Sequence, residues 1–382
     1  MNNIRITKNN SLPFPFLHLA VANPNHWPAL EVLKALCVLV ILFVHPHFLL
    51  ITEGYALVRP QSRVVQLTEE LMVLGVFITM LPIMAGSVIR MGLGNLAGNA
   101  HVKSAYLKRA VFSALFIAFL GFCMNGLTWG GWYFWSWNML QTVAVSYVLC
   151  VLIFFAAGVY GLFFISMLLI FLAQPLASVV GVESDNYFLN VLFGSDSRFT
   201  FWPLFPWAAM PLIGFLYAHF YLKYSDKLQF WLLVLMIGGL LVGYSVYKGQ
   251  FTAPLNSDYV WTQLMIQPSL GEVAGAVGLF SLCMFFLEQL TVKMKNRRYG
   301  MINCFSKGIL WIYLLQMIAS YHLAPWIKQT LTFKSRMELI TLADMVAYAV
   351  FPVTMVVFGW VVGALIVKLI HSQRYRITIR KV

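Results

Sequence analysis

The sequence predicts an all-α, polytopic membrane protein of about ten transmembrane helices with both termini in the cytoplasm. Three observations lead to this class. The 382 residues are 60% hydrophobic and only 10% charged, whereas soluble domains carry about 25% charged residues. Apolar runs recur at lengths near the roughly 20 residues that a helix needs to cross a bilayer. Lys and Arg residues gather in alternate loops, and the positive-inside rule converts that asymmetry into an orientation.

Hydropathy places the helices and the loops between them. The expected helices span 29–50, 70–90, 105–126, 136–157, 159–181, 203–223, 228–247, 268–290, 305–323 and 343–369. With the N-terminus inside, 18 of the 26 Lys and Arg residues lie on the cytoplasmic side, seven lie outside, and Lys34 lies within the membrane. We therefore expect a cytoplasmic segment over 1–28, a single transmembrane domain over 29–370 and a basic cytoplasmic tail over 371–382.

The charge and the cysteines narrow the classes of partner. The net charge of +13 arises from the cytoplasmic loops, so anionic membrane lipid is a better candidate partner than nucleic acid. The five cysteines are scattered, mostly within apolar runs, and none forms a CxxC pair. We expect them to behave as small hydrophobic residues, without disulfides and without a metal site.

The first predicted helix contains Glu31, Lys34 and His45, although a charged group at the centre of a membrane costs about 2.5–3.5 kcal/mol. An offset of eleven residues turns Lys34 and His45 to within about 20° of the same helix face, about 16 Å apart. Glu31 lies three residues before Lys34 and can pair with it. Two other interpretations remain open. Glu31 and Lys34 could extend toward the interface from a helix end, and Pro46 could break or kink the helix at His45.

Aromatic and polar residues gather where the predicted helices reach the outer face. The stretch 128–138 contains four Trp residues, including Trp132, and forms either an interfacial aromatic belt or a stacking platform for a sugar or lipid-linked glycan. Asn125, Asn138 and Glu272 lie at outer helix ends and could contact the same acceptor. Each of these three residues could instead make an ordinary helix–helix hydrogen bond.

This arrangement suits group transfer across the membrane. A cytosolic donor with an anionic group could pass its reactive end inward past Lys34. His45 could then remove a proton from an outer hydroxyl or amine, or carry the acyl group transiently.

The same residues resemble the opening signature of the transmembrane acyltransferase superfamily, which includes acyltransferase type 3 and heparan-α-glucosaminide N-acetyltransferase-like proteins. That signature reads Asp-x-x-Arg-Gly, often with a histidine eleven residues after the arginine. Glu31, Lys34, Ala35 and His45 stand at these positions, as in a divergent member. Further stretches are similar in order, namely 82–87, 106–109, 140–147, 201–207 and 308–316. In the last of them, Gln316 stands where the family often has His.

The resemblance implies a helical bundle that takes an acyl group, expected to be acetyl, from cytosolic acyl-coenzyme A. It implies delivery to a hydroxyl or amine of a surface or lipid-linked glycan, from a bacterial inner membrane, without a bound cofactor. His45 would be the base or acyl carrier, and Lys34, held by Glu31, would orient the donor. The residues implied on the donor side are Lys108, Arg109, Tyr313 and Gln316. Lys108 and Arg109 could equally be ordinary positive-inside charges.

Two rival classes remain open. A transporter or flippase of a lipid-linked glycan or anion would use Glu31, Lys34 and Glu272 as a polar pathway. A non-catalytic assembly subunit would need Lys34 and His45 for stability alone. A homodimer is possible in any of these classes, with the small-residue pair Gly271 and Gly275 as a candidate contact.

Overall fold

The computed structural model describes residues 27–52, 78–93, 100–180, 186–194, 200, 202–249, 268–293, 300–334 and 350–379. Side chains are described over a narrower set, which omits 44–52, 100–102, 180, 292–293, 324–334 and 371–379. Within these residues the regular structure is helical, apart from one isolated parallel bridge between Trp137 and Thr200. The all-α class is therefore confirmed.

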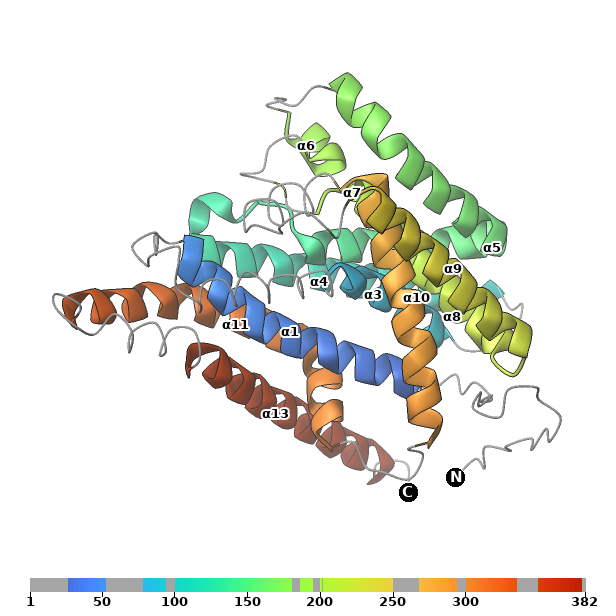
Figure 1. Ribbon diagram of the computed structural model, residues 1–382. Helices are drawn as coiled ribbons and strands as arrows, with labels where there is room; N and C mark the ends of the chain where they lie inside the picture. The colour runs from blue at the N-terminus through green and yellow to red at the C-terminus, as the bar shows by residue number, and fades with distance from the viewer. Residues whose placement is uncertain are drawn as a thin grey trace.

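The helices follow one another along the whole chain (Figure 1). They are α1 (Pro28–Thr52), α3 (Leu81–Leu93), α4 (Ala100–Trp129), the 3-10 helix η2 (Gly131–Tyr133), α5 (Met139–Val180), α6 (Tyr187–Phe193), α7 (Leu204–Trp207), α8 (Ala209–Tyr224), α9 (Leu228–Tyr247), α10 (Leu270–Lys293), α11 (Gly300–Lys334) and α13 (Phe351–Ile379). Each of the ten predicted ranges overlaps one of these helices. The first part of the range 70–90 lies outside the described residues.

Among the described residues, six helices are long and apolar enough to cross a membrane, namely α4, α5, α9, α10, α11 and α13. These spans indicate an integral membrane protein. Two predicted ranges, 136–157 and 159–181, fall within α5, whose backbone leaves helical geometry at Gly158 (φ 65°, ψ −155°). A positive φ is readily adopted by glycine, so the chain can change direction at this residue. The number of ten spans and the orientation of the termini stay predictions.

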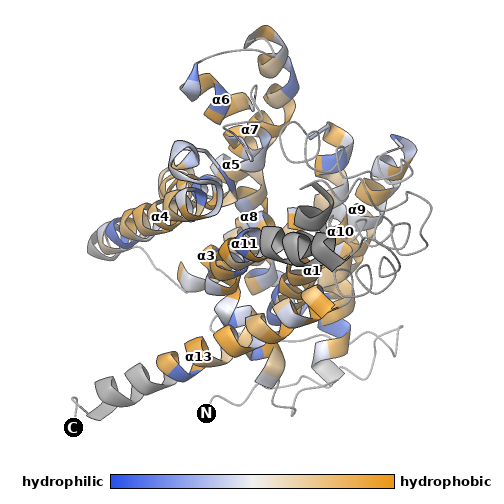
Figure 2. Cartoon of the chain, turned by 90° about the vertical axis from the view of Figure 1, so that its left-hand side faces the viewer, coloured by the Kyte–Doolittle hydropathy of each residue, from blue (hydrophilic) through white to orange (hydrophobic). Residues whose placement is uncertain are grey.

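The outer faces of several helices are apolar, as expected of surfaces that meet lipid. Phe112, Leu115 and Phe119 are exposed along α4, and Val357 and Leu365 are exposed along α13. Figure 2 shows these two helices extending from the bundle with mostly hydrophobic surfaces. A large exposed apolar patch would be unfavourable in water. In a bilayer the same surfaces need no further cover.

Helices α3 and α8 cross closely through two glycines. A Cβ atom at Gly214 would lie 1.8 Å from the carbonyl oxygen of Ile83, and one at Gly86 would lie 1.8 Å from that of Pro211. The hydroxyl of Ser87 spans the same contact and donates to the carbonyl oxygen of Gly214 at 2.9 Å. Small residues that let backbones approach are the usual basis of helix association in membranes. This crossing fixes α3, which forms one wall of the cavity described below.

The start of α1 is held by a buried carboxylate on α10. Glu288 accepts hydrogen bonds from Nε1 of Trp27 at 3.1 Å and from the hydroxyl of Tyr221 at 3.2 Å. The rings of Trp27 and Tyr221 also stack, with their centroids 3.8 Å apart. The beginning of α1 is therefore joined to both α8 and α10.

Candidate functional site

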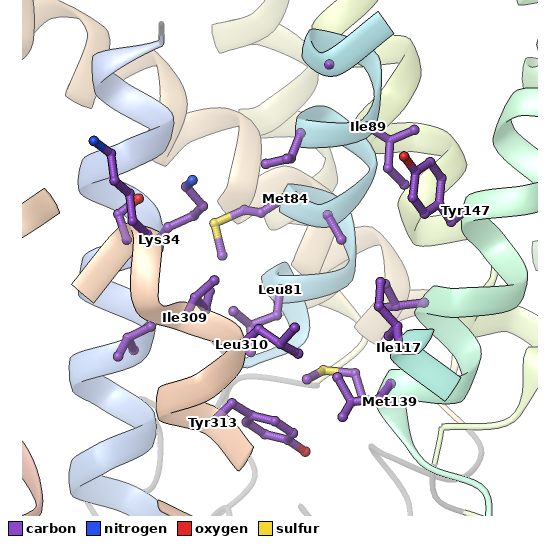
Figure 3. Close-up of a pocket in the computed structure, with 18 of the residues that line it drawn as sticks. Lys34, Leu81, Met84, Ile89, Ile117, Met139, Tyr147, Ile309, Leu310 and Tyr313 are labelled. Carbon is purple, nitrogen blue, oxygen red and sulfur yellow. The ribbon is translucent and has the colours of Figure 1, made fainter. Parts of the chain in front are cut away.

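A cavity of about 590 Å³ lies between α1, α3, α4, α5 and α11 (Figure 3). Its walls are mainly aliphatic and methionine side chains, among them Val38, Met84, Ile89 and Leu310. A volume of this size falls within the range of about 300–1,000 Å³ that is typical of small-molecule sites. The cavity is therefore large enough to hold a ligand.

Charged side chains define one end of the cavity, which we call the basic end. Among the described residues that line the cavity, the charged ones are Lys34, Arg109 and Lys307. Arg109, on α4, lies close enough to Tyr147 for an electrostatic interaction, and Figure 3 shows Tyr147 at a level similar to that of Lys34 but on the opposite side of the cavity. Lys307 directly follows Ser306, which contacts the partner of Lys34. Three cations from three helices thus line the cavity.

Lys34 is held in place by a short network. Its Nζ donates to Oε1 of Glu31 at 2.8 Å, across one turn of α1, as the spacing of three residues predicted. The other carboxylate oxygen of Glu31 accepts a hydrogen bond from the hydroxyl of Ser306 on α11. Lys34 is only 9% exposed, so its ammonium group is positioned within the bundle and does not extend freely into water.

The opposite end of the cavity, which we call the apolar end, is formed by Ile117, Met139, Leu310 and Tyr313 (Figure 3). Ile117 comes eight residues after Arg109 on α4, a rise of about 12 Å along the helix. Tyr313 comes six residues after Lys307 on α11, a rise of about 9 Å. The two ends are therefore separated along the helix axes by about two turns.

The side of α1 that faces the cavity follows a helical register. Lys34, Val38 and Ile41 line the cavity at spacings of four and three residues. The next position in this register is residue 45, because a further four residues return to the same face. The α1 backbone stays helical through His45 and Pro46 to Thr52, so of the interpretations left open by the sequence, a break of the helix at Pro46 does not occur. The side chain of His45 lies outside the described residues.

The expected donor-side residues are not all brought together. Arg109 and Tyr313 line the cavity, whereas Lys108 is exposed and does not. Gln316 is fully buried and comes one turn after Ile312 and Tyr313 on α11, beyond the described lining. The structure therefore groups Arg109 and Tyr313 with Lys34 around one space.

Two of the expected acceptor-side residues belong to a buried amide cluster at the start of α5. The Nδ2 of Asn138 donates to Oδ1 of Asn125 at 2.5 Å, and Asn125 donates to the backbone carbonyl of Ser136. Oδ1 of Asn138 accepts from the backbone N–H of Leu140 at 2.8 Å, which caps the first turn of α5. The cluster fixes the position of Met139, which lies between Asn138 and Leu140 and lines the apolar end.

The other two expected acceptor-side residues lie in different settings. Trp132 is 94% exposed on η2, where either an aromatic belt or a stacking platform remains possible. Glu272 forms a capping box with Ser269 at the start of α10. The backbone N–H of Ser269 donates to Oε2 of Glu272 at 2.5 Å, and the N–H of Glu272 donates to Oγ of Ser269 at 3.2 Å. Capping gives this acid a structural role that its position in an apolar span did not suggest.

Sequence reasoning missed several polar residues. Ser306 gave no signal, because its contact with Glu31 joins positions 275 residues apart. Arg90 counted only as a loop charge, yet it is buried, and its Nε donates to Nδ1 of His219 at 3.3 Å. Glu288 is an acid within a predicted span, and by the rule applied to Glu31 it could have been singled out.

Comparisons with protein-family models, with curated proteins and with solved structures returned no match. The site is therefore interpreted from its own chemistry. A space with several cations at one end and an apolar interior suits a ligand that has an anionic group and a long, slender remainder.

Proposed function

We propose that this protein is a membrane-bound acyltransferase. It would move an acyl group from cytosolic acyl-coenzyme A to a hydroxyl or amine of a glycan or similar acceptor at the outer face, in a bacterial inner membrane. The observation that carries the proposal is the cavity whose basic end holds Lys34 and whose α1 register continues to His45. It offers an anionic donor a path from one side of the bundle toward a histidine.

The basic end would bind the phosphates of the donor. Lys34, Arg109 and Lys307 line the cavity from three helices, and charge-assisted hydrogen bonds between such cations and phosphate oxygens are strong. Glu31 and Ser306 support this role, since they hold the Lys34 ammonium in one place and leave its remaining protons for the ligand. Lys108, which is exposed next to Arg109, would attract the donor at longer range.

The arm of the donor would then extend through the cavity toward the apolar end. Tyr313 and Gln316 on α11 would supply hydrogen bonds along that path. His45 would accept the proton from the acceptor hydroxyl as its oxygen attacks the thioester carbonyl carbon. The C–O bond forms, the C–S bond breaks, and the thiolate of coenzyme A takes up the proton and leaves as the thiol.

On the acceptor side we propose Asn125 and Asn138, whose amide cluster fixes Met139 at the apolar end, and Trp132, which lies on η2 between α4 and α5. Glu272 would serve the acceptor only if its carboxylate can leave the capping box with Ser269. The amide cluster and the exposed ring would then act as a rigid support for the acceptor.

The test is acyl transfer by the purified protein in proteoliposomes. Labelled acetyl-coenzyme A is supplied on one side, and label is followed on an added glycan acceptor, on the protein and as released coenzyme A. His45→Ala should abolish transfer. His47→Ala is the matched control, since residue 47 is two positions out of the cavity register, and it should retain transfer.

Two results would refute the proposal. Transfer that survives in His45→Ala would remove the assigned centre. Net movement of a lipid-linked glycan without any acyl-coenzyme A, combined with absence of donor binding, would favour the transporter class instead.

A further inference from the structure

The side chains that line the apolar end of the cavity determine which chemical groups can bind there. Ile117, Met139 and Leu310 present only hydrocarbon and thioether atoms, and Tyr313 adds one ring with a single hydroxyl (Figure 3). Among the described lining residues, the charged side chains belong to the basic end, and Arg109 and Lys307 lie about two helical turns from Ile117 and Tyr313 respectively. A charged group placed at the apolar end would have no opposite charge within reach in that lining.

A carboxylate at such a position is strongly disfavoured. Moving an ion from water into apolar surroundings without a partner costs far more than moving a neutral group of similar size. An alkyl group gains free energy from the same transfer in proportion to the area that it buries. The apolar end therefore discriminates between acyl groups by charge first and by length second.

Met139 sets the limit on length. It is the first residue of α5 and is 6% exposed, and its backbone is fixed between Asn138 and Leu140 by the amide cluster. The bond from Asn138 to Asn125 ties this position to α4. The backbone that carries the Met139 side chain is therefore held in place by these hydrogen bonds.

We infer that the apolar end is an acyl-group pocket that selects an uncharged acyl chain, with Met139 as the residue that limits its length. The inference rests on the proposed acyltransferase function and names its substrate class. Dicarboxylic acyl groups, such as succinyl, would be disfavoured because the described residues that line the apolar end include no cation, although their thioesters carry the same coenzyme A phosphates to the basic end.

The experiment compares four donors, namely acetyl-, butyryl-, octanoyl- and succinyl-coenzyme A, by kcat/KM in proteoliposomes. Wild-type protein should use acetyl or butyryl groups at least tenfold better than succinyl. Met139→Ala should raise the ratio of octanoyl to butyryl transfer by about fourfold, the gain expected for one additional buried methylene group. Met284→Ala is the control for loss of a buried methionine, because Met284 is fully buried on α10 and does not line the cavity. Its chain-length ratio should equal that of wild type.

The outcomes separate this inference from the proposed function. Equal use of succinyl and acetyl donors, or an unchanged ratio in Met139→Ala, overturns the pocket and leaves acyl transfer intact. Absence of transfer from all four donors overturns the proposed function and the pocket with it. If Met139→Ala does not fold, Met139→Val tests the same wall, and the charge selectivity of the wild type stands as an independent readout.

Discussion

The crossing of α3 and α8 yields a prediction whose size can be worked from the structure. In Gly214→Ala the new Cβ atom would lie 1.8 Å from the carbonyl oxygen of Ile83, whereas real Cβ contacts are not found below 3.0 Å. Backbone atoms cannot rotate away, so the helices must separate locally by more than 1 Å. The hydrogen bond from Ser87 to the carbonyl oxygen of Gly214, now 2.9 Å, would be lost with that movement.

The expected cost follows from those two changes. Overpacking of a tight contact costs about 1–3 kcal/mol, and a lost buried hydrogen bond adds about 1 kcal/mol. We therefore expect Gly214→Ala to lower the free energy of unfolding by about 2–4 kcal/mol. Because α3 contributes Met84 and Ile89 to the cavity wall, donor binding should weaken in the same variant.

The assay is unfolding in mixed micelles by titration with a denaturing detergent, followed by Trp fluorescence. Gly239→Ala on α9 is the control, since a Cβ at Gly239 meets nothing within 4 Å. There the better helix propensity of Ala should leave stability unchanged or slightly raised. In the double variant Gly86→Ala/Gly214→Ala the loss should be smaller than the sum, because both substitutions push the same two helices apart. Equal stability of Gly214→Ala and Gly239→Ala would refute this account of the crossing.

Three further predictions concern single side chains. Lys34→Met should raise the KM for acyl-coenzyme A by about tenfold with a smaller effect on kcat, because an ammonium–phosphate contact is lost. Lys103→Met, on the exposed side of α4, is the control and should leave the KM unchanged. Glu272→Ala should lower the free energy of unfolding by about 1 kcal/mol, because the capping box is lost. An increase in the KM for the acceptor without loss of stability would instead assign Glu272 to acceptor binding. Trp27→Phe retains a ring to stack on Tyr221 but removes the hydrogen-bond donor to Glu288. Detergent titration should therefore show a free energy of unfolding that is lower by about 1–2 kcal/mol. Unchanged stability would contradict the anchoring role of that hydrogen bond.

The positions of the helices could be predicted because hydropathy and the conformational freedom of glycine are local properties of the sequence. The range 228–247 coincides with α9, and the boundary between 136–157 and 159–181 falls on Gly158, where the backbone leaves helical geometry. The pairing of Glu31 with Lys34 was likewise a matter of local spacing on one helix.

What could not be predicted depends on contacts between distant parts of the chain. Ser306 joins Glu31 only because α11 packs against α1, and no periodicity within either helix encodes that choice. Arg90 looks like a loop charge in sequence, yet its side chain is enclosed beside Phe154 and reaches His219. For Glu272, in contrast, a local rule could have predicted the observed contact, because the Ser-x-x-Glu pattern of a capping box begins at Ser269.

The helices around the cavity are not all packed equally closely against one another. Helices α1 and α11 pack along each other, as do α3 and α8, whereas α1 and α3 touch sparsely within the described residues. Near the apolar end α11 is joined to α4 and α5, because Leu314 packs with Met124 and Leu140, and Nε2 of His322 lies 2.7 Å from the carbonyl oxygen of Leu127. Few contacts would therefore be lost if a bulky ligand pushed α1 and α3 apart, whereas widening the cavity near Leu314 would break its packing with Met124 and Leu140.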